Sequence, residues 1–210
     1  MYVPALESLP AIFGNLDIYL FDQLLKGRIR KGMDLLDAGC GVGRNIQYLL
    51  QAGVTVYGAD ISAEAIHKTR ELAKQASYGI EGNFIVSDLA ALPYAKGKFD
   101  VVLCSAVLHF ARDEEHFRRI VKELWRVLKP GGMLFCRFST TIGMAGKLQQ
   151  VSERHYQMPD GPVWFLADEA LLQDLSVSLD ADLLEPLKTV LVEQVRSMTT
   201  WVLQKEMVPK

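Results

Sequence analysis

Two kinds of residue in this chain have the chemistry to hold a polar ligand: glycines in a tight turn, and acids that follow apolar segments. Gly39 and Gly41 come directly after the apolar segment that ends at Asp37. Because glycine has no Cβ, this turn lets the backbone approach a ligand closely. Asp60 ends the next apolar segment, about twenty residues on, where a carboxylate can accept two hydrogen bonds from a ribose diol. The alternative is that Asp60 only leads into a helix capped by Ser62.

Two later segments repeat this arrangement of an apolar run followed by a polar turn. Asp88 follows the run that ends at Val86, and a turn or helix-cap aspartate is the alternative to a ligand contact there. Cys104 ends another apolar run and is most simply a small buried residue. His109 comes shortly afterwards, and a near-neutral imidazole could take a proton from an O–H, N–H or S–H group. The alternative for His109 is a histidine that packs or bonds to the backbone.

These turns need a scaffold that brings them together, and the pattern of the chain predicts an α/β fold. Apolar, β-branched runs alternate with segments whose apolar residues recur at helical spacing. The predicted strands are 33–38, 54–59, 83–86, 99–105 and 133–138, followed by a closing pair around 183–192 and 197–204. The predicted helices are 16–29, a helix that carries Ile46 to Leu50, a helix capped by Ser62, a helix from Asp113 to Leu128, and 168–176.

Parallel strands joined by helices bury both faces of their sheet, so helices must cover both sides. We therefore expect a Rossmann-like, doubly wound, mostly parallel seven-stranded sheet. Ligands of such folds bind beyond the carboxyl ends of the strands. The turns described above should accordingly meet at one edge of the sheet.

The motifs in these turns resemble those of a known family. The string LLDAGCGVGRN at 35–45 is similar to motif I of class I S-adenosylmethionine-dependent methyltransferases (type 11/25-like domains), and LKPGG at 128–132 is similar to their post-helix signature. The resemblance runs from Gly32 to Arg137 and implies S-adenosyl-L-methionine as cofactor. It also implies that Asp60 binds the ribose, Ile61 the adenine face and Asp88 the adenine amino group. The implied donor site consists of Asp37, Gly39, Cys40, Gly41, Asp60, Ile61, Asp88, Leu89 and Cys104.

Dinucleotide-binding folds carry a GxGxxG loop at the same point, which makes a nicotinamide dehydrogenase an alternative. Arg44 stands where that fingerprint requires its third small residue, so the methyltransferase interpretation is preferred. CSAV at 104–107 does not match the Pro-Pro-aromatic motif of family members that methylate amino groups of nucleobases. Methylation of such amino groups is therefore disfavoured.

The family resemblance demands no particular catalytic residue, because the sulfonium already has a good leaving group. The protein has mainly to align the nucleophile and exclude water. His109 is the candidate general base. The segment 139–167 lies where the family inserts substrate-binding structure, and it offers Arg154 as an anion partner together with His155 and Trp164. The alternative for this segment is a surface loop with packed apolar residues.

The composition is that of one globular domain, since 210 residues of which 50% are hydrophobic can bury one sizeable core. We expect a single domain over 1–210, made of an N-terminal helical segment 1–32, a cofactor-binding core 33–138, a substrate-side insertion 139–167, and a last helix with closing strands 168–210. Dispersed charges with a net of −2 predict no nucleic-acid partner, and the lack of a long apolar run predicts no membrane partner. Three cysteines without ligand spacing predict neither disulfide nor metal, as in a cytoplasmic protein.

The sequence thus favours an enzyme that moves a methyl group from S-adenosylmethionine to a small-molecule acceptor. One alternative is a protein or RNA methyltransferase, which would need a basic groove or an added recognition domain. Another is a non-catalytic module that binds S-adenosylmethionine but forms no S-adenosylhomocysteine. The sequence predicts neither the identity of the acceptor nor the choice between a monomer and a homodimer.

Overall fold

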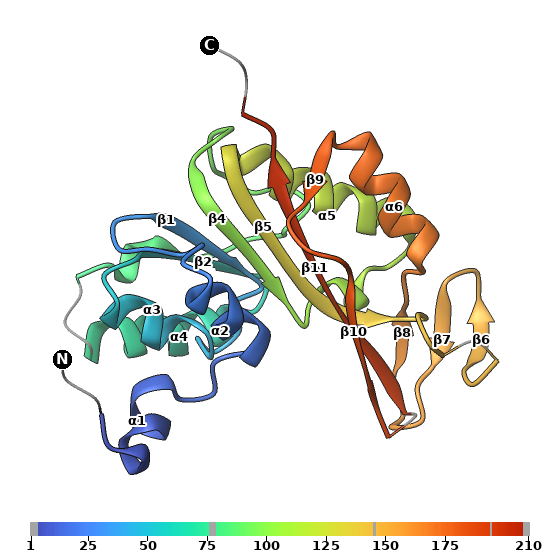
Figure 1. Cartoon of the computed structure of the whole chain (residues 1–210), viewed down its shortest axis with the longest axis horizontal. Helices are drawn as coiled ribbons and strands as arrows, with labels where there is room; N and C mark the ends of the chain where they lie inside the picture. Colours follow the sequence, from blue (N-terminus) through green and yellow to red (C-terminus); the bar gives the residue numbers. More distant parts are fainter. Residues whose placement is uncertain (1–3, 76–78, 145, 194, 208–210) are drawn as a thin grey trace.

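The computed structural model describes residues 4–75, 79–144, 146–193 and 195–207. Over these residues, eight strands form one sheet, with the order β10-β11-β5-β4-β1-β2-β3 and with β9 paired to β11 (Figure 1). The parallel part consists of β1 (Asp34–Ala38), β2 (Thr55–Asp60), β3 (Phe84–Val86), β4 (Phe99–Ser105) and β5 (Leu128–Thr140). The antiparallel part consists of β9 (Ala181–Leu183), β10 (Lys188–Val192) and β11 (Arg196–Lys205). The predicted doubly wound, mostly parallel sheet is confirmed, with β9 as an additional short strand.

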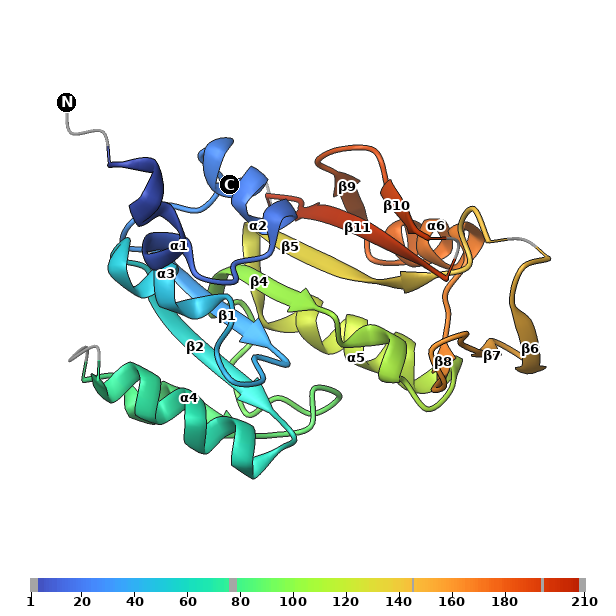
Figure 2. The ribbon, with the colours of Figure 1, turned by 90° about the horizontal axis from the view of Figure 1, so that it is seen from below.

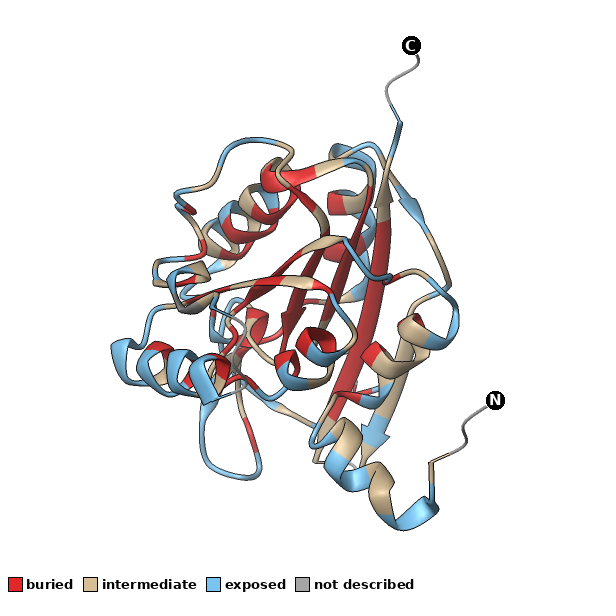
Figure 3. Ribbon diagram, turned by 90° about the vertical axis from the view of Figure 1, so that its left-hand side faces the viewer, coloured by how far each residue is buried: buried red, intermediate tan, exposed pale blue. Residues whose placement is uncertain are grey.

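Helices cover both faces of this sheet (Figure 2). One face carries α2 (Ile18–Leu25), α3 (Ile46–Gln51) and α4 (Ala63–Gln75), and the other carries α5 (Glu114–Val127) and α6 (Glu169–Ser178). The short helices are η1 (Leu6–Ser8), α1 (Leu9–Phe13), η2 (Glu81–Asn83) and η3 (Leu108–Phe110). Alternate residues of β1 enter the two cores, Leu35 beside α2 to α4 and Leu36 beside α5 and α6. The central strands are therefore buried on both faces, which explains their continuous apolar runs (Figure 3).

The leading helix α2 is shorter than the predicted helix 16–29. It begins after Asp17, whose side chain caps the helix by accepting a hydrogen bond from the Tyr19 N–H at 2.9 Å. It ends before Gly27, which has a φ of 67° and turns the chain away. Periodicity alone extended the prediction because apolar residues continue beyond both of these caps.

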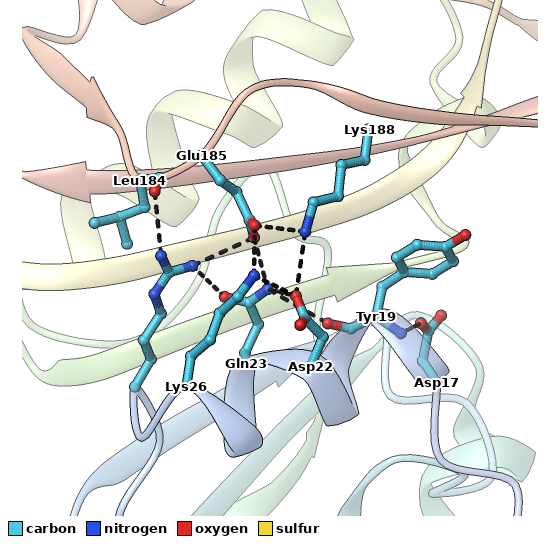
Figure 4. Close-up of polar contacts among 9 residues, drawn as sticks. Asp17, Tyr19, Asp22, Gln23, Lys26, Leu184, Glu185 and Lys188 are labelled. Carbon is cyan, nitrogen blue, oxygen red and sulfur yellow. Dashed lines mark hydrogen bonds and ion pairs between the residues drawn. The ribbon is translucent and has the colours of Figure 1, made fainter.

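Charged side chains connect α2 to the loop between β9 and β10 (Figure 4). Glu185, whose side chain is 9% exposed, accepts hydrogen bonds from Gln23 (2.7 Å) and Lys26 (2.6 Å). It also forms ion pairs with Lys188 (2.6 Å) and Arg28 (3.3 Å). Burial acts to raise the pKa of Glu185, but these contacts outweigh burial and lower the pKa to about 2. The loop thus holds α2 on the sheet through an ionised carboxylate.

Two further boundaries differ from the prediction. The strand predicted at 133–138 begins at Leu128, because residues 129–132 bulge between two paired positions and pairing with β4 resumes at Met133. Gly131, with a φ of 77°, supplies the turn inside this bulge. The strand predicted around 183–192 is divided into β9 and β10, so the closing part of the sheet has one more strand than expected.

The insertion 139–167 contains a second sheet, formed in the described residues by β6 (Gln149–Ser152), β7 (His155–Gln157) and β8 (Val163–Phe165). This small sheet lies beyond the N-terminal end of α5 in Figure 2. The chain enters and leaves it at nearly the same point, because Thr140 and Ala167 form a β-bridge. The N–H of Thr141 also donates to the carbonyl of Ala167 at 3.0 Å. The segment thus forms strands of its own, which the sequence analysis did not predict.

Candidate functional site

A pocket of about 440 Å³ lies at the carboxyl ends of β1 to β4. Its lining residues are Gly39, Gly41, Asp60, Ile61, Ser87, Asp88, Leu89, Ala106, Val107, Phe110, His116 and Ile120. The structure thus brings the four turns predicted from the sequence, after β1, β2, β3 and β4, together at one edge of the sheet. Of the residues expected at the donor site, Asp37, Cys40 and Cys104 do not line the pocket but lie buried behind it.

The glycine turn after β1 is packed so closely that its first glycine admits no side chain. A Cβ at Gly39 would lie 2.3 Å from a methyl carbon of Val107, and the φ of Gly39 is 81°. The N–H of Gly39 donates to the carbonyl of Ala59 at 2.7 Å, which fixes the turn against β2. Backbone rather than side chain therefore forms this wall of the pocket.

Asp60, the last residue of β2, is held at the pocket by two backbone hydrogen bonds. Its Oδ2 accepts from the N–H of Gly41 at 2.9 Å, and its Oδ1 accepts from the N–H of Ser62 at 2.9 Å. Each oxygen keeps a further lone pair, so the carboxylate can still accept hydrogen bonds from a ligand. Asp60 thus stabilises the turn that leads into α4, and it also lines the pocket.

Asp88 stands in the turn after β3, with its side chain about half exposed. Its Oδ1 accepts a hydrogen bond from the N–H of Ala90 at 2.8 Å. Leu89, the next residue, is buried beside the pocket. His116 of α5 faces Asp88, with 4.0 Å between its Nε2 and Oδ1 of Asp88.

Asp37 is a buried acid at the end of β1, with 1% of its surface exposed. Burial raises its pKa to about 7, and Arg44 acts against this shift. Its Oδ2 has no hydrogen-bond partner among the described residues. The carboxyl group is thus poised between its neutral and ionised forms near neutral pH.

The thiols near the site are unreactive. Cys40 and Cys104 are both buried. Burial is the main cause that raises the pKa of Cys40, and the neighbouring Cys136 thiol together with burial raises that of Cys104. Protonated thiols are poor nucleophiles, so these cysteines act as buried packing residues.

His109 lies in η3, directly after β4, and is 4% exposed. Burial lowers its pKa to about 4, with a smaller contribution from Arg196. The backbone N–H of Ser139 donates to its Nδ1 at 3.4 Å. The imidazole is therefore neutral at physiological pH, and this contact favours the tautomer that carries the proton on Nε2.

The three residues predicted from the insertion are separated by the structure. The ring of Trp164 lies 4.4 Å from that of His109, so it belongs to the neighbourhood of the pocket. His155 instead contacts Phe165, with ring centroids 5.9 Å apart. Arg154 forms ion pairs with Glu114 at 2.6 Å and Asp168 at 2.7 Å, and these two acids balance its charge.

Six residues that line the pocket were not among the predicted site residues, namely Ser87, Ala106, Val107, Phe110, His116 and Ile120. Phe110 directly follows His109, and its 62% exposure makes it an apolar surface available to a ligand. His116 and Ile120 are separated by four positions on α5, so they share one face of that helix. This spacing could have identified them, once the start of α5 was known to face the turn after β3.

Within the described ranges, no helix is long and apolar enough to span a membrane. No group of three or more His, Cys, Asp or Glu side chains in the same residues is arranged to hold a metal ion.

The profile of the family described as "Methyltransferase domain" matches residues 36–136, which run from β1 to β5 and include the pocket. Over these residues the chain is similar to a methyltransferase domain. Its resemblance to that family, seen in motif I and in the LKPGG signature, is thereby confirmed.

Curated relatives match this methyltransferase domain over its core. A magnesium-protoporphyrin O-methyltransferase from Synechocystis is 41% identical over 85 residues, which are 40% of this chain and 36% of the relative. A ubiquinone biosynthesis O-methyltransferase from Coxiella burnetii is 34% identical over 110 residues, which are 52% of this chain and 44% of the relative. The matches thus span less than half the length of these relatives.

Solved structures share the fold over most of the chain. An S-adenosylmethionine-dependent methyltransferase from Methanosarcina mazei has a TM-score of 0.72 and 22% identity, with 88% of this chain and 98% of that chain covered. The magnesium protoporphyrin IX methyltransferase from Synechocystis with bound S-adenosylmethionine has a TM-score of 0.67 and 22% identity, with 90% and 77% covered. This similarity extends the agreement in fold beyond the part that the family profile matches.

Proposed function

We propose that this chain binds S-adenosyl-L-methionine in the pocket and transfers its methyl group to a small-molecule acceptor. The observation that carries the proposal is the pair of carboxylates, Asp60 and Asp88, that line one pocket with the glycine turn. Relatives named for O-methylation of magnesium-protoporphyrin and for ubiquinone biosynthesis support a small-molecule acceptor. A related fold solved with bound S-adenosylmethionine supports the donor.

The donor has a charged sulfonium, a ribose diol and an adenine, and the pocket residues suit these three parts. Asp60 accepts from the ribose hydroxyls, while Ile61, 76% exposed at the pocket, packs on the adenine. Asp88 accepts from the adenine amino group, and the N–H of Leu89 donates to a ring nitrogen. Gly41, which has no atom within 4 Å of the place where a Cβ would stand, leaves open the space that a side chain would fill.

The acceptor binds beside Phe110, the pocket residue whose ring contacts those of His109 and Trp164. The ring centroids of His109 and Phe110 are 4.4 Å apart, and those of Phe110 and Trp164 are 6.1 Å apart. Such a surface favours a flat, largely apolar acceptor. Arg154, which the sequence suggested as an anion partner, stays a weaker candidate because Glu114 and Asp168 already balance its charge.

The sulfonium of the bound donor supplies an electrophilic methyl carbon and a good leaving group. The protein aligns the acceptor with the S–CH3 bond and excludes water. As a general base, His109 would need an unprotonated Nε2, whereas the contact from Ser139 favours a proton on that atom. His109 therefore orients the acceptor by donating from Nε2, and the acceptor's proton leaves to solvent.

Calorimetry with S-adenosylhomocysteine tests the donor site, and Asp60→Asn is the informative variant because it keeps the shape of the side chain while removing its charge. We expect micromolar binding by the wild type, weakening of about tenfold or more in Asp60→Asn, and no binding of NAD. Absence of S-adenosylhomocysteine binding would contradict the proposal. A chain that binds the donor but forms no S-adenosylhomocysteine with a panel of flat phenols and carboxylic acids would instead be a non-catalytic module.

A further inference from the structure

His116 is held in one orientation at the start of α5. The N–H of Arg112 donates to its Nδ1 at 3.1 Å, and its own N–H donates to the capping carboxylate of Asp113 at 2.7 Å. Because Nδ1 accepts a hydrogen bond, the neutral ring carries its proton on Nε2. Burial is the main cause that lowers the pKa of His116, so the ring is neutral at physiological pH.

The Nε2–H of His116 is a donor without an acceptor. The atom is withdrawn from solvent and has no hydrogen-bond partner among the described residues. Its side chain is 12% exposed and faces Asp88, whose Oδ1 lies 4.0 Å from Nε2. A movement of about 1 Å would form a hydrogen bond of ordinary length. A buried donor without an acceptor costs free energy, so a conformation in which the Nε2–H of His116 donates to Oδ1 of Asp88 is favoured.

We propose that His116 is a positioning residue that holds Asp88 for the exocyclic amine of the donor's base. This inference rests on the proposed function. Oδ1 of Asp88 is then fixed by two donors, the N–H of Ala90 and the Nε2–H of His116. Its Oδ2 is left to accept from an amine in the pocket. A base with a carbonyl at the same position would bring oxygen against oxygen, so the fixed carboxylate selects adenine over its deaminated form.

A purely structural role is the competing explanation, because His116 is the third residue of α5 and its contact with Arg112 resembles a helix cap. The two roles separate in substitutions. Glutamine can accept from Arg112 and still offer a donor at the position of Nε2, whereas methionine has a similar length and offers neither. Loss of the cap lowers the melting temperature, while loss of positioning lowers the selectivity between bases.

The test measures the dissociation constants of S-adenosylhomocysteine and S-inosylhomocysteine for the wild type, His116→Gln and His116→Met, together with melting temperatures. We expect the wild type to prefer the adenine ligand by about tenfold or more, His116→Gln to keep that preference, and His116→Met to reduce it to about threefold or less. In an Asp88→Asn background, His116→Met should leave the ratio unchanged, because the positioned carboxylate is already absent.

An unchanged ratio in His116→Met, or an equal reduction with and without Asp88, would overturn the positioning role. A wild type that binds S-adenosylhomocysteine well but shows no preference over S-inosylhomocysteine would also overturn it, while leaving the proposed function intact. A wild type that binds neither ligand would instead refute the proposed function, and this inference with it.

Discussion

Asp37 shows how a single buried carboxyl group makes the ligand-free protein sensitive to pH. Burial raises its pKa to about 7, so the folded state binds the proton more tightly than the unfolded chain, in which an aspartate has a pKa of about 3.9. The stability that Asp37 contributes is therefore full below about pH 4. It declines as the pH rises to about 7, and it is lost above that value.

The substitution Asp37→Asn should remove this decline, because asparagine resembles the protonated acid and stays neutral. We expect the variant to gain about 4 kcal/mol relative to the wild type between about pH 4 and pH 8. Urea denaturation at the two pH values measures the difference. Asp34→Asn, on the same strand but partly exposed, is the matched control. A difference that does not change with pH would contradict the pKa assigned to Asp37.

The tautomer of His109 can be observed directly, without knowledge of the acceptor. We expect long-range ¹H–¹⁵N correlation spectra to show a neutral ring with its proton on Nε2 at neutral pH, because the N–H of Ser139 donates to Nδ1. Protonation should begin only near about pH 4, since burial lowers the pKa of this ring. His109→Gln identifies the signal by its loss. A ring with its proton on Nδ1 would restore the general-base role predicted from the sequence.

At the scale of elements, the contact between α2 and the loop after β9 should weaken at acidic pH. Glu185 has a pKa of about 2, below the value of about 4.3 for an unfolded glutamate. A lowered pKa contributes stability above the unfolded value, and this contribution is lost as the pH falls toward the folded value. The helix should accordingly loosen from the sheet in acid.

Glu185→Gln tests this contact, because the amide keeps the size of the side chain and removes its charge. We expect a loss of about 2 kcal/mol at neutral pH, shrinking toward zero between about pH 4 and pH 2. Chemical denaturation across this range provides the measurement. Glu206→Gln, at an exposed position directly after β11, serves for comparison. A loss as large at about pH 2 as at neutral pH would show that packing rather than charge holds α2.

For the molecule as a whole, the central strands could be predicted from the sequence because they are buried on both faces. Their apolar runs are continuous, and each is followed by a polar turn, so both the sheet and the edge that carries the pocket could be inferred. Asp60, Asp88 and the glycines were identified in this way, whereas Ile61 was implied by the family resemblance, and all of them line the pocket.

What could not be predicted depends on contacts between distant segments. The neutralisation of Arg154 needs Glu114 and Asp168, which lie far away along the chain. The division of 183–192 into two strands also follows from tertiary pairing, since β9 and β10 bond different parts of β11. His116 was missed because its helical spacing says nothing about which turn its face meets.

The β-bridge between Thr140 and Ala167 makes the insertion 139–167 a unit that can be exchanged as a whole. Because its two ends are already joined on the main sheet, a segment of different length or composition can replace it at little cost in loop-closure entropy. The pocket in which we propose that the donor binds is built from other segments, at the carboxyl ends of β1 to β4 and the start of α5. Evolution or a protein engineer could therefore exchange the insertion while the pocket at the carboxyl ends of β1 to β4 stays unchanged.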